Sequence, residues 1–157
     1  MTRPETEAPS PAPPPILFSV LMFPFGAMSG YVSVALAYDL GQAGVSAVAI
    51  GTLIAIGFVP HTWKFLWAPI VDSTWAPRGW YWASVVVSAL GVLAMGSIAT
   101  TAASVPLLSA VVLLANLAVT FNGMSVEYMV AHCAPPHRRG AYAGWLQVGN
   151  LAGGGVG

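Results

Sequence analysis

Ionisable side chains are few in this chain, and those that interrupt or flank its long apolar segments are the ones able to do chemistry. Lys64 closes one such segment, and Glu127 lies near the end of another, which also contains Asn122. A charged or amide group in an apolar segment typically binds a solute or ion, carries protons, or pairs with another polar group. These three residues are therefore the candidates for a solute or proton pathway.

Each ionisable candidate has a second interpretation. Lys64 either extends its ammonium group to the water interface or contacts an anionic solute or a buried acid. Glu127 is either a hydrated interfacial carboxylate or a proton carrier, since it lies close to the predicted end of its helix. Asp72 is expected to cap or latch a neighbouring helix end, where exposed N–H groups favour a carboxylate.

Other motifs favour neither an enzyme nor a metal or nucleotide site. His132, Cys133 and His137 lack a fourth ligand and the ordered spacing of a zinc site. The glycines in residues 153–157 follow no predicted strand and precede no Lys-Ser or Lys-Thr pair, as a phosphate loop would require. No Ser, His and Asp set and no pair of carboxylates is present. We therefore expect no catalytic residue, no metal and no cofactor.

The composition indicates that the lipid bilayer is the chain's solvent. Hydrophobic residues make up 57% of the sequence and charged residues only 6%, and the mean hydropathy is +0.75. An average soluble domain is roughly 25% charged. The formal net charge of zero gives no reason to expect nucleic acid as a partner, and the single cysteine cannot form an internal disulfide. The sequence therefore predicts an integral membrane protein.

The apolar segments predict an all-α membrane protein with four complete transmembrane helices and the start of a fifth. About 20 residues at 1.5 Å per residue cross a hydrocarbon core of about 30 Å. The predicted helices are residues 16–38, 45–71, 80–103, 105–130 and 141–157. They form a transmembrane domain, residues 16–157, that the chain end truncates. The proline-rich residues 1–15 are predicted to be a disordered tail.

Small residues and basic residues give two further predictions. Gly26 and Gly30 form one face for close helix packing, and Gly149, Gly153 and Gly157 form another. All basic residues fall on one side of the predicted helices; they are Arg3, Lys64, Arg78, Arg138 and Arg139. The positive-inside rule then places the N-terminus in the cytoplasm of a multi-pass protein of the inner (plasma) membrane.

Two stretches resemble a known family. The run from Lys64 to Asp72, followed by Arg78, resembles the helix 2 to helix 3 signature of major facilitator transporters, and within them the muropeptide permease (AmpG-like) and acetyl-CoA transporter group. The helix 4 exit of that group is matched in order by Glu127, Pro135, Pro136, Arg138, Arg139 and Gly140. The resemblance spans residues 21–157. The chain departs from it at Ser73 and Gly123, where the group has a basic and an acidic residue.

The resemblance implies part of the N-terminal six-helix half of a major facilitator fold, whose partner is the missing C-terminal half. It implies proton-coupled import of a small solute such as a muropeptide-like sugar-peptide. Asp72 and Arg78 would then belong to a gating turn, and Arg138, Arg139 and Gly140 to a cytoplasmic loop. The alternative is a small self-contained membrane protein that oligomerises and has a structural or transport role.

Overall fold

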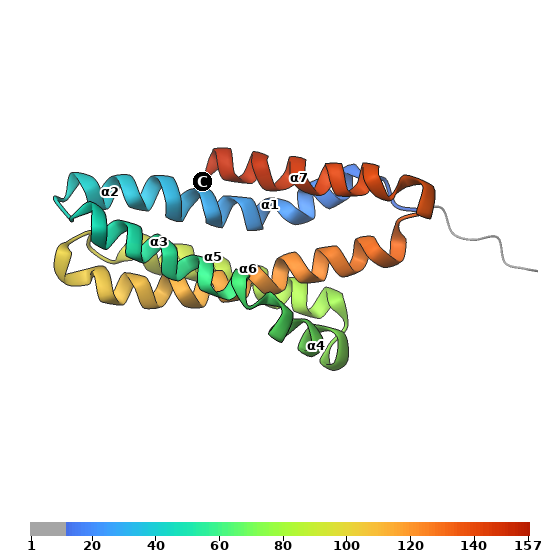
Figure 1. Ribbon diagram of the computed structural model, residues 1–157, viewed down its shortest axis with the longest axis horizontal. Coiled ribbons are helices and arrows are strands. Elements are labelled where there is room, and N and C mark those ends of the chain that lie inside the picture. Colours follow the sequence, from blue (N-terminus) through green and yellow to red (C-terminus); the bar gives the residue numbers. More distant parts are fainter. Residues whose placement is uncertain (1–11) are drawn as a thin grey trace, which may run out of the picture.

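The computed structural model describes residues 12–157, and these residues are helical apart from short connections (Figure 1). No strand is present in this range. The tail predicted for residues 1–15 lies mostly outside the described residues, as does the side chain of Asp72. The described chain is therefore all-α, as the sequence predicts.

The helices and helical turns follow one another with few intervening residues. In chain order they are α1 (Ile16–Gly30), the π-helix η1 (Tyr31–Leu36), α2 (Ala37–Gln42), α3 (Ala47–Thr62), α4 (Lys64–Thr74), α5 (Pro77–Ser97), the 3₁₀ turn η2 (Ala102–Ser104), α6 (Val105–Cys133), the 3₁₀ turn η3 (Pro136–Arg138) and α7 (Arg139–Val156).

Three helical stretches within residues 12–157 are long and apolar enough to cross a membrane by themselves. They are Ile16–Gln42, Pro77–Ser97 and Ala102–Cys133. The pair α3 and α4 reaches the required length and hydropathy only when its two helices are taken together. The expected four complete spans are thus reached only if this bent pair counts as one span.

The expected single helix over residues 45–71 is interrupted at Trp63, and the helices on either side differ in direction by 47°. Pro60 lacks an N–H donor, and its ring crowds the carbonyl of the preceding turn. The helix ends shortly afterwards, because Trp63 leaves helical geometry with φ −95° and ψ 16°. The prediction of an unbroken helix is corrected, and Lys64 begins a new helix at the bend.

The first helical stretch is longer than predicted. It continues through Asp39 to Gln42, and the turn follows at Gly44, whose φ of 76° suits a residue without a Cβ. Ser46 then caps α3, since its hydroxyl accepts a hydrogen bond from the Ala49 N–H at 3.3 Å. The predicted turn from Asp39 to Gly44 therefore shrinks to its last residues.

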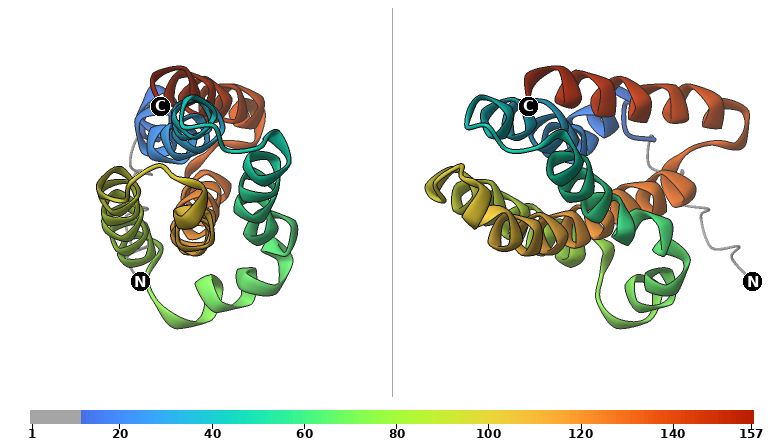
Figure 2. Two further views of the ribbon diagram at one scale, coloured as in Figure 1. Left: turned by 90° about the vertical axis from the view of Figure 1, so that its left-hand side faces the viewer. Right: turned by 60° about the vertical axis from the view of Figure 1, so that its left-hand side comes forward.

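Helix α6 is the central element of the bundle. It contacts α1, α3, α4, α5 and α7, and Figure 2 shows it surrounded by these helices. Its contact with α5 is close: a Cβ added to Gly91 would lie 2.6 Å from the Cβ of Ala115. The largest buried cluster joins Val112 and Val119 of α6 to Leu53 of α3 and Met95 of α5. Residues of α6 are therefore positioned by several neighbours at once.

Helices α1 and α7 pack side by side and run parallel (Figure 1). A Cβ on Gly26 would lie 1.9 Å from the Asn150 carbonyl oxygen, and one on Gly153 would lie 2.3 Å from that of Phe23. The Ser19 hydroxyl donates to the Trp145 carbonyl oxygen at 2.6 Å, which adds a polar contact along the same seam. The two predicted glycine faces are therefore each other's partners.

Candidate functional site

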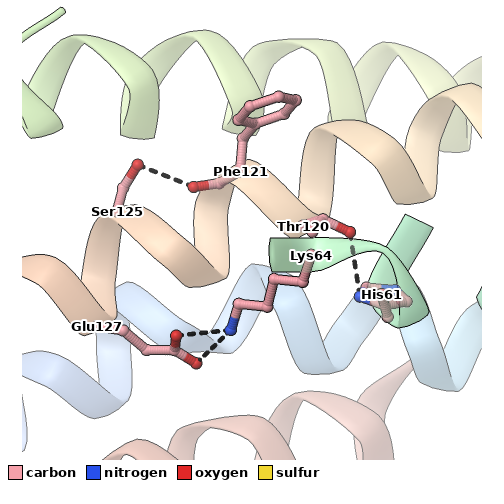
Figure 3. A network of polar contacts seen from close by, with 6 residues as sticks. All are labelled: His61, Lys64, Thr120, Phe121, Ser125 and Glu127. Carbon is pink, nitrogen blue, oxygen red and sulfur yellow. Dashed lines mark hydrogen bonds and ion pairs between the residues drawn. The ribbon is translucent and has the colours of Figure 1, made fainter. Parts of the chain in front are cut away.

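Lys64 and Glu127 form an ion pair between α4 and α6 (Figure 3). The Lys64 Nζ donates to both carboxylate oxygens, at 2.7 Å to Oε1 and 2.6 Å to Oε2. The two side chains are 37% and 47% exposed, so neither is sealed in the core. Lys64 occupies this position because the bend at Trp63 makes it the first residue of α4.

This is the only ion pair among the side chains that the structure describes, which do not include that of Asp72. Each charge offsets the cost of placing the other beside apolar helices. A protonated Glu127 would no longer hold Lys64 by its charge, and a competing anion could replace the carboxylate. The arrangement can therefore exchange a proton or an anionic group without leaving both charges unpaired.

A second polar group, centred on His61 near the end of α3, lies next to the ion pair (Figure 3). Its Nε2 is 3.3 Å from the Asn116 Oδ1, and its Nδ1 is 3.1 Å from the Thr120 Oγ1. The Asn116 amide nitrogen donates to the Val112 carbonyl oxygen at 2.9 Å, and the Thr120 hydroxyl donates to the Asn116 carbonyl oxygen at 2.8 Å. The ring is thus held by α6 through both of its nitrogens.

A cavity of about 430 Å³ opens beside these groups. It is lined by Phe25, Ser29, Phe58, His61, Lys64, Thr120 and Asn150. The lining comes from α1, α3, α4, α6 and α7 and combines hydroxyl, amide, imidazole and ammonium groups with two phenyl rings. Typical small-molecule sites have this mixture and a volume of about 300–1,000 Å³. The cavity can therefore hold a small polar solute.

A neighbouring cavity of about 640 Å³ lies between α4 and α6. It is lined by Thr62, Lys64, Phe65, Ala68, Val71, Met124, Glu127, Tyr128 and Ala131. Lys64 lines both cavities, whereas Glu127 lines only the larger one. Lys64 therefore lies between Glu127 and the smaller, more polar cavity.

Asn122, the third predicted pathway residue, lies elsewhere. It is 0% exposed, and neither atom of its amide has a hydrogen-bond partner among the described residues. It lines neither of the two cavities next to Lys64. The structure thus brings Lys64 and Glu127 together and leaves Asn122 apart from them.

Of the predicted gating and loop residues, Arg78, Arg138, Arg139 and Gly140 line neither of the two cavities next to Lys64. Asp72 is in α4, and Arg78 is exposed in the first turn of α5. Arg138 ends η3, and Arg139 and Gly140 begin α7, all three exposed. Helix α6 also continues to Cys133, so Glu127 is farther from its helix end than predicted.

The sequence interpretation did not select His61, Asn116, Thr120 or Asn150 as site residues. One signal was available for His61: it precedes Lys64 by three residues at the end of an apolar segment. Asn150 has a weaker signal, since it lies between glycines that face α1.

Comparison with known proteins adds no relative. No protein-family model, curated protein or solved structure has a significant match to the chain. The functional conclusion therefore depends on the residues and their geometry, together with the resemblance of short motifs.

Proposed function

We propose that this chain is part of a secondary transporter of the major facilitator type, which imports a small solute together with protons. The observation that carries the proposal is the Lys64–Glu127 ion pair beside a polar cavity in a bundle of apolar helices. Buried or half-buried charges in apolar membrane segments are costly, and they typically mark solute or proton pathways.

The substrate class and the partner follow from the motif resemblance. The group that the anchor run and the helix 4 exit resemble suggests a muropeptide-like sugar-peptide as the solute. In such transporters two six-helix halves rock about a site near the bilayer midplane. The missing C-terminal half of the same transporter is then the partner that completes the site, with the lipid bilayer around both.

In the alternative, a small membrane protein that oligomerises, the glycine faces would permit contact with a second copy. Gly26 and Gly153 instead meet the backbone of α7 and α1 within one chain. These faces therefore offer no surface to a second copy, and the transporter is the better-supported proposal.

Uptake by the protein expressed from its whole natural reading frame tests the function. We expect Glu127→Gln to reduce solute uptake and to change its pH dependence, because the substitution removes the acid that pairs with Lys64. Uptake of labelled muropeptide into cells or proteoliposomes, measured across a pH series, gives both quantities. Unchanged uptake with an unchanged pH profile would reduce Glu127 to an interfacial residue.

Orientation in the membrane can be tested separately. We propose that the α4–α5 connection faces the cytoplasm, since Lys64 and Arg78 flank it. Cys133, which is exposed, is replaced by Ser, and single cysteines are introduced at the exposed positions Ser73 and Gln42. An impermeant thiol reagent added to intact cells should label Gln42→Cys and spare Ser73→Cys. The reverse pattern would overturn the orientation.

A further inference from the structure

The lining of the 430 Å³ cavity has a positively charged side chain and no negatively charged one. Among its lining residues Lys64 brings a full positive charge, and none brings a carboxylate. Glu127, which neutralises Lys64, approaches it from the side of the larger cavity. An anion in the smaller cavity would therefore meet the ammonium group without meeting the acid.

Three hydrogen bonds join His61, Asn116 and Thr120, whereas a neutral imidazole and the Thr120 hydroxyl together supply only two protons. The Asn116 amide oxygen Oδ1 can only accept a hydrogen bond, and it is the atom that faces His61 because the amide nitrogen donates to the Val112 carbonyl oxygen. The Thr120 hydroxyl has one proton, and it donates this proton to the Asn116 carbonyl oxygen. As long as Thr120 keeps this hydrogen bond, both ring nitrogens of His61 must donate, Nε2 to the Asn116 Oδ1 and Nδ1 to the Thr120 Oγ1.

Either neutral tautomer loses one of these three hydrogen bonds. With the proton on Nε2, the Thr120 hydroxyl must leave the Asn116 carbonyl to donate to Nδ1. With the proton on Nδ1, the bare Nε2 faces the Asn116 Oδ1, and two acceptors meet. Only the doubly protonated ring donates to both partners at once, so a proton completes the network.

We propose that this cavity binds the carboxylate of a small hydroxylated solute together with one proton, and that His61 holds the proton. The carboxylate lies against Lys64, and Ser29, Thr120 and Asn150 offer hydrogen bonds to hydroxyl groups. The inference rests on the proposed transport function and assigns its solute class and a proton site. The proton comes from the solvent and leaves with the solute.

The charges around His61 explain why the carboxylate and the proton should bind together. Lys64 and, beyond it, Glu127 are the ionisable groups that face His61 among the described residues. The neighbours from α1 are Phe25 and Ser29, the neighbour from α7 is Asn150, and none of them titrates. A second positive charge beside Lys64 is repelled, and a bound carboxylate offsets that repulsion. By linkage, the carboxylate and the proton each raise the affinity for the other.

Isothermal titration of the protein expressed from its whole reading frame, in detergent, tests this pairing. Glucuronate is the probe, and glucose is its uncharged counterpart of nearly the same shape. The titrations are run at about pH 7.5, one unit above the ordinary pKa of histidine, in buffers of different ionisation enthalpy. The dependence of the binding heat on the buffer gives the number of protons taken up.

We expect glucuronate to bind roughly tenfold more tightly than glucose, and to bring about one proton with it. His61→Gln should abolish the proton uptake, whereas the control His132→Gln, a histidine outside the cavity, should leave it unchanged. Thr120→Val, which removes the acceptor of the Nδ1–H, should reduce the proton uptake while the bundle remains folded.

Several results would overturn the inference. If glucuronate fails to bind, or binds no better than glucose, the proposed carboxylate site is refuted. If glucuronate binds to the wild-type protein without proton uptake, the proposed coupling between carboxylate binding and protonation is refuted. If His61→Gln no longer binds glucuronate, its proton uptake cannot be measured, and Thr120→Val becomes the test. Full proton uptake by Thr120→Val would contradict the proposal that the hydrogen bonds around His61 hold the proton. Proton uptake that persists in His61→Gln but disappears in Glu127→Gln would assign the proton to Glu127, and the proposed transport function would still stand.

Discussion

Helices α1 and α7 touch through their backbones, whereas α4 and α6 touch through long charged side chains. On the first seam glycines such as Gly26 and Gly153 leave no room even for a methyl group. On the second, the Lys64–Glu127 ion pair lies beside a cavity of about 640 Å³. The comparison teaches that one bundle combines a dry, rigid seam with an open, polar one, and that groups able to exchange partners lie on the open seam.

The largest effect is expected from breaking the dry seam. Gly26→Ala places a Cβ 1.9 Å from the Asn150 carbonyl oxygen, so the two helices must separate. We expect a loss of about 2–3 kcal/mol in the free energy of unfolding. Thermal or denaturant unfolding in detergent measures it.

Gly51→Ala is the matched control, because Gly51 of α3 has open space where the Cβ would lie. Both substitutions favour the helical state of the backbone, so the control should be neutral or more stable by about 0.5–1 kcal/mol. Equal stability changes in the two variants would mean that the α1–α7 seam is not close-packed.

An intermediate effect on the free energy of unfolding is expected from replacing two asparagines of α6, which differ in their hydrogen-bond partners. The amide of Asn122 has no hydrogen-bond partner among the described residues, whereas that of Asn116 contacts His61 and the Val112 carbonyl oxygen. Leucine has the same branching as asparagine without its polar atoms. We expect Asn122→Leu to raise the free energy of unfolding by about 1–2 kcal/mol and Asn116→Leu to lower it by a similar amount.

The same unfolding measurement compares the two asparagine variants directly, and uptake adds a second quantity. If Asn122 belongs to the solute pathway, Asn122→Leu should lose uptake while it gains stability. A loss of stability in Asn122→Leu would show that its amide has a partner that offsets its burial.

The smallest effect is expected from the open seam. Lys64→Met, Glu127→Gln and the double variant form a double-mutant cycle for the ion pair. Because both side chains are partly exposed, we expect a coupling of only about 0.5 kcal/mol in unfolding. The uptake defects of the single variants should be much larger than this coupling suggests. A coupling as large as the effect of Gly26→Ala would make the ion pair a structural clamp.

The sequence predicts those features that depend on local pattern. The all-α class follows from apolar segment length, and the close packing of Gly26 and Gly153 follows from glycine spacing. Which face meets which is a tertiary property, and no local pattern predicts that α1 and α7 are partners. The bend at Trp63 was missed because Pro60 is tolerated in many membrane helices, so its presence alone does not predict a break.

The charged residues of the candidate site could be predicted from the sequence, but the contacts between its residues could not. Lys64 and Glu127 stand out in a sequence with few ionisable residues, yet their contact joins positions 63 residues apart. His61 has no pattern that distinguishes a ligand-binding imidazole from a buried one. The role proposed for His61 depends on Asn116 and Thr120, which only the packing of α3 on α6 brings to its ring.

The π-helical turn in the first long helix has a consequence for the two seams together. Such a turn holds one residue more than an α-helical turn, so it shifts the angular phase of every later side chain by about 100°. Before Tyr31 the helix presents glycines to α7, while Met28 already belongs to the buried cluster that contains Leu53 of α3. Leu36, the last residue of the π-helical stretch, and Leu40 beyond it extend the same cluster. One uninterrupted helix thus contacts both α7 and the cluster around Leu53, and the extra residue rotates the side chains beyond it relative to those before it.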